Sequence, residues 1–169
     1  MGRSERAQLR AARAGSLDAF EQLFRAHWPR AYRAALLVVG DAAAAEDIAQ
    51  ESFLAAVRSL DRFDRRRPFG PWLHRIVVNR AIDWARARAL RAEAALGAEP
   101  AVEDVRELSD ELLGTLAHLS PEHRAVIVLR HVLGYSPGEI AELLGLPRGT
   151  VNSRLRRGLD ELKERLGDA

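Results

Sequence analysis

The sequence predicts an all-α fold with two small helical domains joined by a linker. Apolar residues recur at helical spacing along most of the chain, and helix-capping residues precede several of these runs. No segment shows the alternating pattern of a strand, and the sequence has no internal repeat. The length of 169 residues suits one ordinary domain or two small ones, and a hydrophobic content of 47% is enough for buried cores.

Composition excludes several classes of function. The chain has no cysteine, which rules out disulfides, thiolate metal sites and thiol catalysis. No apolar run approaches the roughly 20 residues of a membrane span, and the basic N-terminus lacks the apolar stretch of a signal peptide. We therefore predict a cytoplasmic protein without membrane insertion. The net charge of +2 is small, so the position of the charges matters more than their sum.

The first domain is predicted over residues 14–91, and its first helices are marked by capping and breaking residues. Ser16 is a candidate N-cap for the run that follows. Pro29 is expected to break this run, with a second helix continuing from it. Gly40 is expected to end that second helix in the usual C-terminal role of glycine.

The rest of the first domain is predicted as a helix, a loop and a further helix. Asp41 can cap a helix that extends to about Leu60. Residues 61–71 contain two prolines and a glycine, which predicts a loop. A strongly patterned helix follows over about 72–90.

The segment 92–108 changes character and predicts a linker, because it is rich in alanine and acidic residues and contains a glycine and a proline. The second domain is predicted over 109–167. Helices are expected at 109–118 and 121–133, and the second is preceded by a serine and begins with a proline, as helix starts often do.

The stretch 136–162 has the pattern of a helix-turn-helix. Ser136 and Glu139 form a capping box at its start. Gly145 suits a left-handed turn position, and Pro147 can start the second helix. Apolar residues at helical spacing predict the buried side of that second helix: Val151, Leu155, Leu159 and Leu162.

The outward side of that second helix carries residue types that suit a DNA groove. Arginine binds guanine or phosphate, asparagine pairs with adenine, and hydroxyl groups hold phosphates. A solvated helical hairpin with surface arginines is the plainer alternative, but it leaves the capping box and the buried stripe in register unexplained. The candidate DNA-binding residues are Arg148, Thr150, Asn152, Ser153, Arg156 and Arg157.

A second candidate surface lies on the helix 41–60. Asp47, Gln50, Glu51 and Leu54 share one side of this helix, so acidic and polar groups stand beside an exposed apolar residue. The patch is either an ordinary solvated face or a dock for a basic partner. From its chemistry alone the solvated face is favoured.

A third candidate surface is basic. Residues 61–91 hold nine arginines against three aspartates. Arg75, Asn79 and Arg86 fall within about 40° of one another on a helical wheel. A basic helix after an arginine-rich loop is a typical nucleic-acid footprint, and a loop aromatic such as Phe69 can stack on a base or pack into the core.

The stretches "DAAAAEDIAQESFLAAVRSLDRFDRRRPFGPWLHRIVVNRAIDWAR" and "LSPEHRAVIVLRHVLGYSPGEIAELLGLPRGTVNSRLRRGLDEL" together resemble bacterial sigma-70 factors. The similarity is strongest to the small extracytoplasmic-function (ECF) group, which keeps only sigma domains two and four. It covers about residues 14–166.

The resemblance implies a non-enzymatic RNA polymerase subunit that directs promoter-specific transcription initiation and needs no cofactor. Residues 14–91 would be domain two, which docks on core polymerase and recognises and melts the −10 element. Residues 109–167 would be domain four, whose helix-turn-helix reads the −35 element in the major groove. The implied −10 contacts are Arg66, Arg67, Phe69, Arg75, Asn79 and Arg86.

The same resemblance reverses the interpretation of the patch on 41–60. Its residues would contact the β′ clamp of core polymerase, and domain four would contact the β flap. An anti-sigma factor is a further implied partner, and it could hold the protein near the membrane. The acidic linker would follow the RNA path and could mimic RNA, although plain solvation explains its charge equally well.

Two other classes of function fit the sequence less well. A dimeric regulator using only the helix-turn-helix would leave the patch on 41–60 unexplained. A metalloenzyme would need ligands, and the five histidines form no HExxH motif or similar metal-binding spacing.

Overall fold

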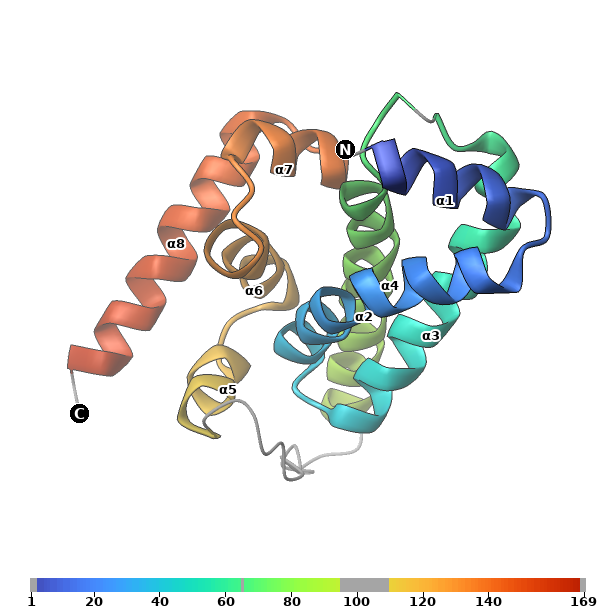
Figure 1. Cartoon of the computed structure of the whole chain (residues 1–169). Helices are drawn as coiled ribbons and strands as arrows, with labels where there is room; N and C mark the ends of the chain where they lie inside the picture. Colours follow the sequence, from blue (N-terminus) through green and yellow to red (C-terminus); the bar gives the residue numbers. More distant parts are fainter. Residues whose placement is uncertain (1–2, 65, 95–109, 168–169) are drawn as a thin grey trace.

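The computed structural model describes residues 3–64, 66–94 and 110–167, and all the regular structure in these ranges is helical (Figure 1). The first module contains α1 (Arg3–Arg13), α2 (Leu17–Val39), α3 (Ala42–Arg58), the 3-10 turn η1 (Leu60–Arg62) and α4 (Phe69–Ala94). The second module contains α5 (Asp110–Ala117), α6 (Pro121–Ile127), the π-helical turn η2 (Val128–Val132), α7 (Pro137–Leu144) and α8 (Arg148–Gly167).

The predicted caps form as the sequence indicates. The Ser16 side chain accepts a hydrogen bond from the amide of Ala19, and Asp41 does the same for Ala44 at the start of α3. Gly40 ends α2 in the left-handed conformation, with φ of 69°. These residues therefore set where α2 stops and where α3 begins.

Two expectations about the first module were wrong, and one helix forms where none was predicted. Pro29 does not break the helix but lies inside the continuous α2. Pro29 is exposed, so water can satisfy the carbonyl that loses its helical partner. The N-terminal segment, for which no helix was expected, forms α1. The last helix begins at Phe69 rather than 72, because Pro71 is tolerated in a first turn, where amides have no helical partner.

The core of the first module is formed by the facing sides of α2, α3 and α4, with α1 packed on α2. Apolar side chains of α3 and of the turn after it are buried in this core, among them Ile48, Phe53, Ala56 and Leu60. Leu9 buries its side chain and anchors α1, and Glu5 of the same helix hydrogen-bonds His27 at 3.0 Å. Gln8 also donates a hydrogen bond to Gln22, and Arg13 pairs with Asp61. Burial of a leucine and these polar contacts therefore hold a helix that is otherwise mostly alanine and arginine.

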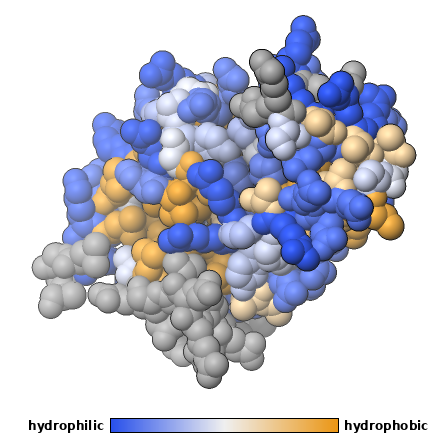
Figure 2. Space-filling model, viewed as in Figure 1, coloured by the Kyte–Doolittle hydropathy of each residue, from blue (hydrophilic) through white to orange (hydrophobic). Residues whose placement is uncertain are grey.

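The second module is built around the predicted helix-turn-helix. Ser136 and Glu139 form both hydrogen bonds of the capping box, and Gly145 adopts the left-handed conformation at the end of α7. Val151 and Leu155 of α8 are buried, whereas Leu159 and Leu162 are half-buried against the core. Hydrophobic residues gather where α6 and α8 lie together, on an otherwise largely hydrophilic face (Figure 2).

The two modules pack against each other. Helices α2 and α4 of the first contact α6 of the second, and α4 also contacts α7 (Figure 1). The expected helix 121–133 changes at Val128 into the π-helical turn η2, which lies against α2. The linker prediction for 92–108 falls almost entirely outside the described residues.

Candidate nucleic-acid and protein interfaces

The predicted protein-docking patch is an exposed side of α3. Asp47, Gln50, Glu51 and Leu54 are all exposed, and Leu54 leaves 50% of its surface open to solvent. Within the molecule, Glu51 accepts a hydrogen bond of 2.7 Å from Arg80 of α4. A large apolar side chain held in water beside carboxylates is a feature that a partner surface would explain. We name these four residues the α3 patch.

The predicted basic surface follows the start and one side of α4. Arg66, Arg67, Arg75 and Arg86 are exposed, and Asn79 is half-buried. We name these five residues the α4 face. The arginines of this face come from the loop before α4 and from α4 itself. The conformation of the loop therefore decides whether they form one surface.

A short turn holds that loop. Asp64 accepts hydrogen bonds from the backbone amide of Arg66 at 3.0 Å and from its side chain at 3.1 Å. These two bonds lower the pKa of the Asp64 carboxyl below its usual value. The carboxylate therefore fixes the backbone of Arg66, but the Arg66 side chain remains 91% exposed.

Phe69 does not present its ring to a ligand in this structure. The side chain is only 2% exposed. Its ring lies 5.0 Å from the ring of His27 and 5.7 Å from that of Trp72, measured between centroids. Gly70 lies in the same corner, where an added Cβ would be in van der Waals contact with the His27 ring at 3.5 Å. Phe69 thus anchors the loop, and the sequence-based expectation of a base contact is not supported by its position.

The α8 face is the exposed side of the second helix of the helix-turn-helix. Arg148, Asn152, Arg156 and Arg157 are exposed, and Thr150 and Ser153 are half-buried. We name these six residues the α8 face. Val151 and Leu155 are buried on the opposite side, so the packing of α8 on α6 and α7 directs the polar residues outward.

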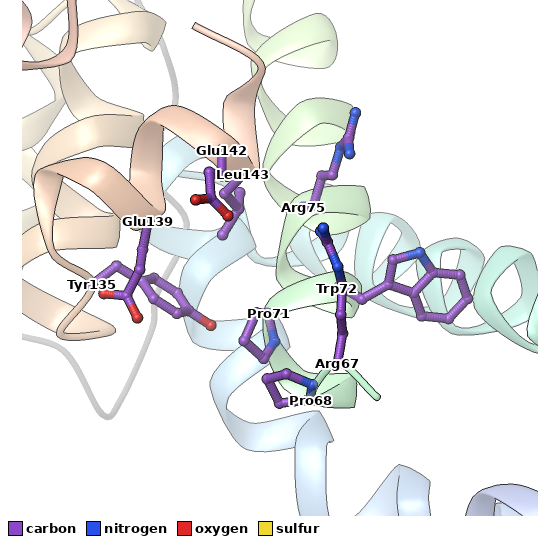
Figure 3. Close-up of a pocket in the computed structure, with 9 residues that line it drawn as sticks. All are labelled: Arg67, Pro68, Pro71, Trp72, Arg75, Tyr135, Glu139, Glu142 and Leu143. Atoms are coloured by element: carbon purple, nitrogen blue, oxygen red, sulfur yellow. The ribbon is translucent and has the colours of Figure 1, made fainter. Parts of the chain in front are cut away.

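A cavity of about 370 Å³ separates the α4 face from α7. Arg67 and Arg75 line it from the first module, whereas Glu139 and Glu142 line it from the second (Figure 3). Three turns further along α4, Arg86 donates a hydrogen bond to Glu122 at the start of α6. Sequence reasoning identified the arginines but missed these acidic neighbours, because they come from a distant part of the chain.

Other kinds of site find no support among the described residues. In residues 3–64, 66–94 and 110–167, no group of three or more histidine, cysteine or acidic side chains could hold a metal ion. Within the same ranges, no helix is both long and apolar enough to cross a lipid bilayer.

Known families match both modules. Residues 23–91 match the family described as Sigma-70 region 2, and residues 109–162 match Sigma-70, region 4. The chain is 39% identical to the RNA polymerase sigma factor CarQ of Myxococcus xanthus, covering 92% of this chain and 94% of CarQ. It is 33% identical to the ECF RNA polymerase sigma factor SigW of Bacillus subtilis, covering 95% and 96%.

Two solved structures are similar to the whole chain. CnrH in complex with the cytosolic domain of CnrY has a TM-score of 0.75 and 32% identity, covering 98% of each chain. The sigma factor RpoE in complex with the anti-sigma factor NepR, from Bartonella quintana, has a TM-score of 0.74 and 25% identity, covering 89% of this chain and 98% of RpoE. With its region 2 and region 4 domains and its helix-turn-helix, the chain belongs to the ECF group of sigma-70 family RNA polymerase sigma factors, which are non-enzymatic subunits for transcription initiation.

Proposed function

We propose that the three faces divide the work of promoter recognition. The α3 patch docks on the β′ clamp of core polymerase, the α4 face recognises and melts the −10 element, and the α8 face reads the −35 element. In this division residues 14–91 act as domain two and 109–167 as domain four, which also contacts the β flap. The observation that supports it is the separation of charge by helix: acid on α3, arginine on α4 and α8.

The chemistry of each face fits its proposed ligand. The α8 face offers arginine and asparagine on a helix that can enter the major groove, where bidentate contacts distinguish base pairs. The α4 face offers cations in a row for the phosphates of a single strand. The buried Phe69 leaves Arg66, Arg67 and the half-buried Trp72 as the loop groups nearest to a captured base.

An anti-sigma factor is part of this proposal. The relative RpoE is seen in complex with an anti-sigma factor, which supports a partner of the same kind for this chain. We propose that the protein acts in the bacterial cytoplasm and that such a partner controls its access to polymerase. The exposed Leu54 and the arginines of the α4 face are the groups that a partner would have to cover.

The test is core polymerase binding by two charge-reversal variants. Asp47→Arg with Glu51→Arg should abolish binding, because two attractive contacts to a basic surface become repulsive. Asp160→Arg with Glu164→Arg makes the same change in charge at two exposed positions of α8 and serves as the control. Affinity is measured by pull-down and titration with purified core enzyme.

The structure adds one refinement to this test. Glu51 also pairs with Arg80, so its reversal disturbs α4 as well as the patch. Leu54→Ala touches no ion pair, and its side chain is half exposed, so it should weaken core binding while leaving the unfolding midpoint unchanged. If all these variants bind core polymerase like the wild type, the α3 patch is a solvated face and the proposal is wrong.

A further inference from the structure

The cavity between the α4 face and α7 is lined by opposite charges on its two sides. Arg67 and Arg75 line it from the first module, and Glu139 and Glu142 line it from the second (Figure 3). The formal charges of these four side chains add to zero. Among the described residues, no ion pair joins an arginine of the cavity to a glutamate across it.

The two arginines form one side of the cavity. Arg67 extends from the loop along α4 toward Arg75 (Figure 3). Both side chains are exposed, and within the described ranges neither guanidinium makes a hydrogen bond or an ion pair. An arginine can bind a carboxylate through two parallel hydrogen bonds, so this side of the cavity suits the anionic end of a ligand.

The two glutamates form the opposite side, on α7. The Glu139 carboxylate accepts a hydrogen bond of 2.8 Å from the amide of Ser136. Hydrogen bonds to the backbone and side chain of Ser136 lower the pKa of Glu139, so its carboxylate is ionised at neutral pH. Glu142 follows one turn later and makes no hydrogen bond or ion pair within the described part of the chain. This side suits a cationic group.

Apolar groups lie between the charged sides. Pro68 and Pro71 line the cavity from the first module, and Leu143 lines it from α7. Trp72 also borders the cavity, but its indole ring points away and packs on Phe63, with 4.7 Å between the ring centroids (Figure 3). The cavity therefore offers aliphatic contacts between its charges, and the indole face is not turned toward a ligand.

Buried contacts fix the distance between the two sides. Tyr135, which lines the cavity just before α7, places its hydroxyl 2.6 Å from Nδ1 of His74, the neighbour of Arg75 in α4. His74 is almost fully buried. The guanidinium of Arg124 in α6 is also buried and donates a hydrogen bond of 2.6 Å to the carbonyl of Val38 in α2. Packing of the modules therefore sets the width of the cavity, and its charges do not close on one another.

The charge pattern distinguishes between classes of ligand. A polyanion would meet the two glutamates and a metal cation would meet the two arginines, so one side of the cavity repels each of them. A molecule with a carboxylate at one end and an ammonium or guanidinium at the other matches both sides. Its methylene chain also matches the apolar groups between them. The volume of about 370 Å³ lies within the usual range for small-ligand sites.

We propose that this cavity binds a small dipolar molecule of the amino-acid type, with a carboxylate at one end and an amino or guanidino group at the other. The carboxylate binds Arg67 and Arg75, and the cationic end binds Glu139 and Glu142. The inference goes beyond the proposed function and does not depend on it, because neither polymerase nor promoter takes part. It assigns a small-molecule ligand to a site that both modules share.

The experiment is a titration of the free, full-length chain with two dipolar probes, ε-aminocaproate and the shorter γ-guanidinobutyrate, followed by amide NMR. Both probes carry one carboxylate and one cation. We expect saturable shifts of amide signals in α7 and in the first turns of α4. Caproate lacks the cation and hexylamine lacks the carboxylate, so each should bind about tenfold more weakly than ε-aminocaproate.

Variants of each side test the assignment. Arg75→Gln and Glu142→Gln each remove one charge of the cavity without breaking a hydrogen bond or an ion pair of the described chain. The affinity for ε-aminocaproate should fall about tenfold in each variant. Arg62→Gln and Glu164→Gln make the same changes in charge at exposed positions outside the cavity and should bind like the wild type. The unfolding midpoint, measured by circular dichroism, should be unchanged in all four.

The proposal is supported if binding needs both ends of the probe and both sides of the cavity. Equal shifts with ε-aminocaproate, caproate and hexylamine, or no saturable binding of either dipolar probe, would show that the cavity holds only water and would overturn the proposal. Equal loss of affinity in the cavity variants and in their controls would place the binding elsewhere and would also overturn it. Affinity for core polymerase is measured separately, and its outcome decides the proposed function without affecting this inference.

Discussion

The α4 face and the α8 face have similar chemistry but different surroundings. Both present arginines with an asparagine on one side of a helix. The α8 face is positioned by its own module, through the packing of α8 on α6 and α7, and stays open. The α4 face lies against acidic side chains from the other end of the chain. Local sequence therefore sets the residue types of a face, and long-range packing sets the charges that surround it.

The largest effect is expected from the open face. Arg156→Ala with Arg157→Ala removes two potential base or phosphate contacts, each of which is worth about 1–3 kcal/mol in discrimination. Transcription from a promoter that needs its −35 element should fall by roughly a factor of 10² or more. The measurement is in vitro transcription alongside core affinity, which should not change.

Lys163→Ala, also exposed on α8 but outside the α8 face, is the matched control for this prediction. It should reduce transcription only slightly. Equal loss of core affinity and of transcription in the double variant would show that α8 holds polymerase rather than DNA, and would remove the distinction between the two faces.

The next effect depends on pH. It concerns His74, which is buried where the two modules meet. Burial, followed by the nearby Arg30 and His27, lowers the pKa of His74 to about 4 from a model-compound value of 6.5. The unfolded chain therefore takes up a proton below about pH 6.5 that the folded chain refuses. Stability is complete above pH 6.5 and falls as the pH drops toward 4, by up to about 3 kcal/mol.

Urea unfolding at pH 7.5 and pH 5 measures this loss. Tyr135 does not titrate in that range, because burial raises its pKa to about 12. His74→Gln should lose less stability between the two pH values than the wild type. His131→Gln, at an exposed histidine of η2, should lose as much as the wild type. An identical loss in both variants would mean that His74 is not the group that titrates.

The smallest effect is expected at the cap of the helix-turn-helix. Ser136→Ala removes the hydrogen bond to the amide of Glu139, which should lower the free energy of unfolding by about 1 kcal/mol. Because Ser136 belongs to none of the three faces, affinity for core polymerase should stay at the wild-type value. Ser16→Ala, the equivalent change at α2, is the control in the first module. A loss of core affinity in Ser136→Ala would show that docking depends on the stability of the second module.

The helix boundaries could be predicted wherever a local signal sets them. Ser16, Asp41, Ser120 and Ser136 all form the side-chain caps that their positions indicate. The prediction at Pro29 was wrong because, on the exposed side of a long and well-packed helix, a proline destabilises the helix by less than the packing stabilises it. The helix α1 was missed because its sequence is only weakly apolar, and its anchors, Leu9 and Glu5, find their partners in α2 and beyond.

The three candidate faces were predicted from residue type and spacing, and their residues lie mainly on exposed helix sides, with Phe69 as the buried exception. The packing of acidic side chains from the second module near the α4 face could not be predicted. Arg124, Tyr135 and Glu122 read as ordinary members of helices and turns, and no local pattern indicates that their partners lie in the first module. Contacts of this kind pair single residues far apart in sequence, so they become visible only in three dimensions.

The buried Arg124 of α6 donates hydrogen bonds to backbone carbonyls of both modules. Of its three carbonyl partners, Ala117 and Leu119 move with the arginine, and only Val38 belongs to the other module. On separation the guanidinium would keep two bonds and exchange the third for water. The bond to Val38 therefore restrains the angle between the modules, while the other two bonds hold the arginine side chain in place within the second module.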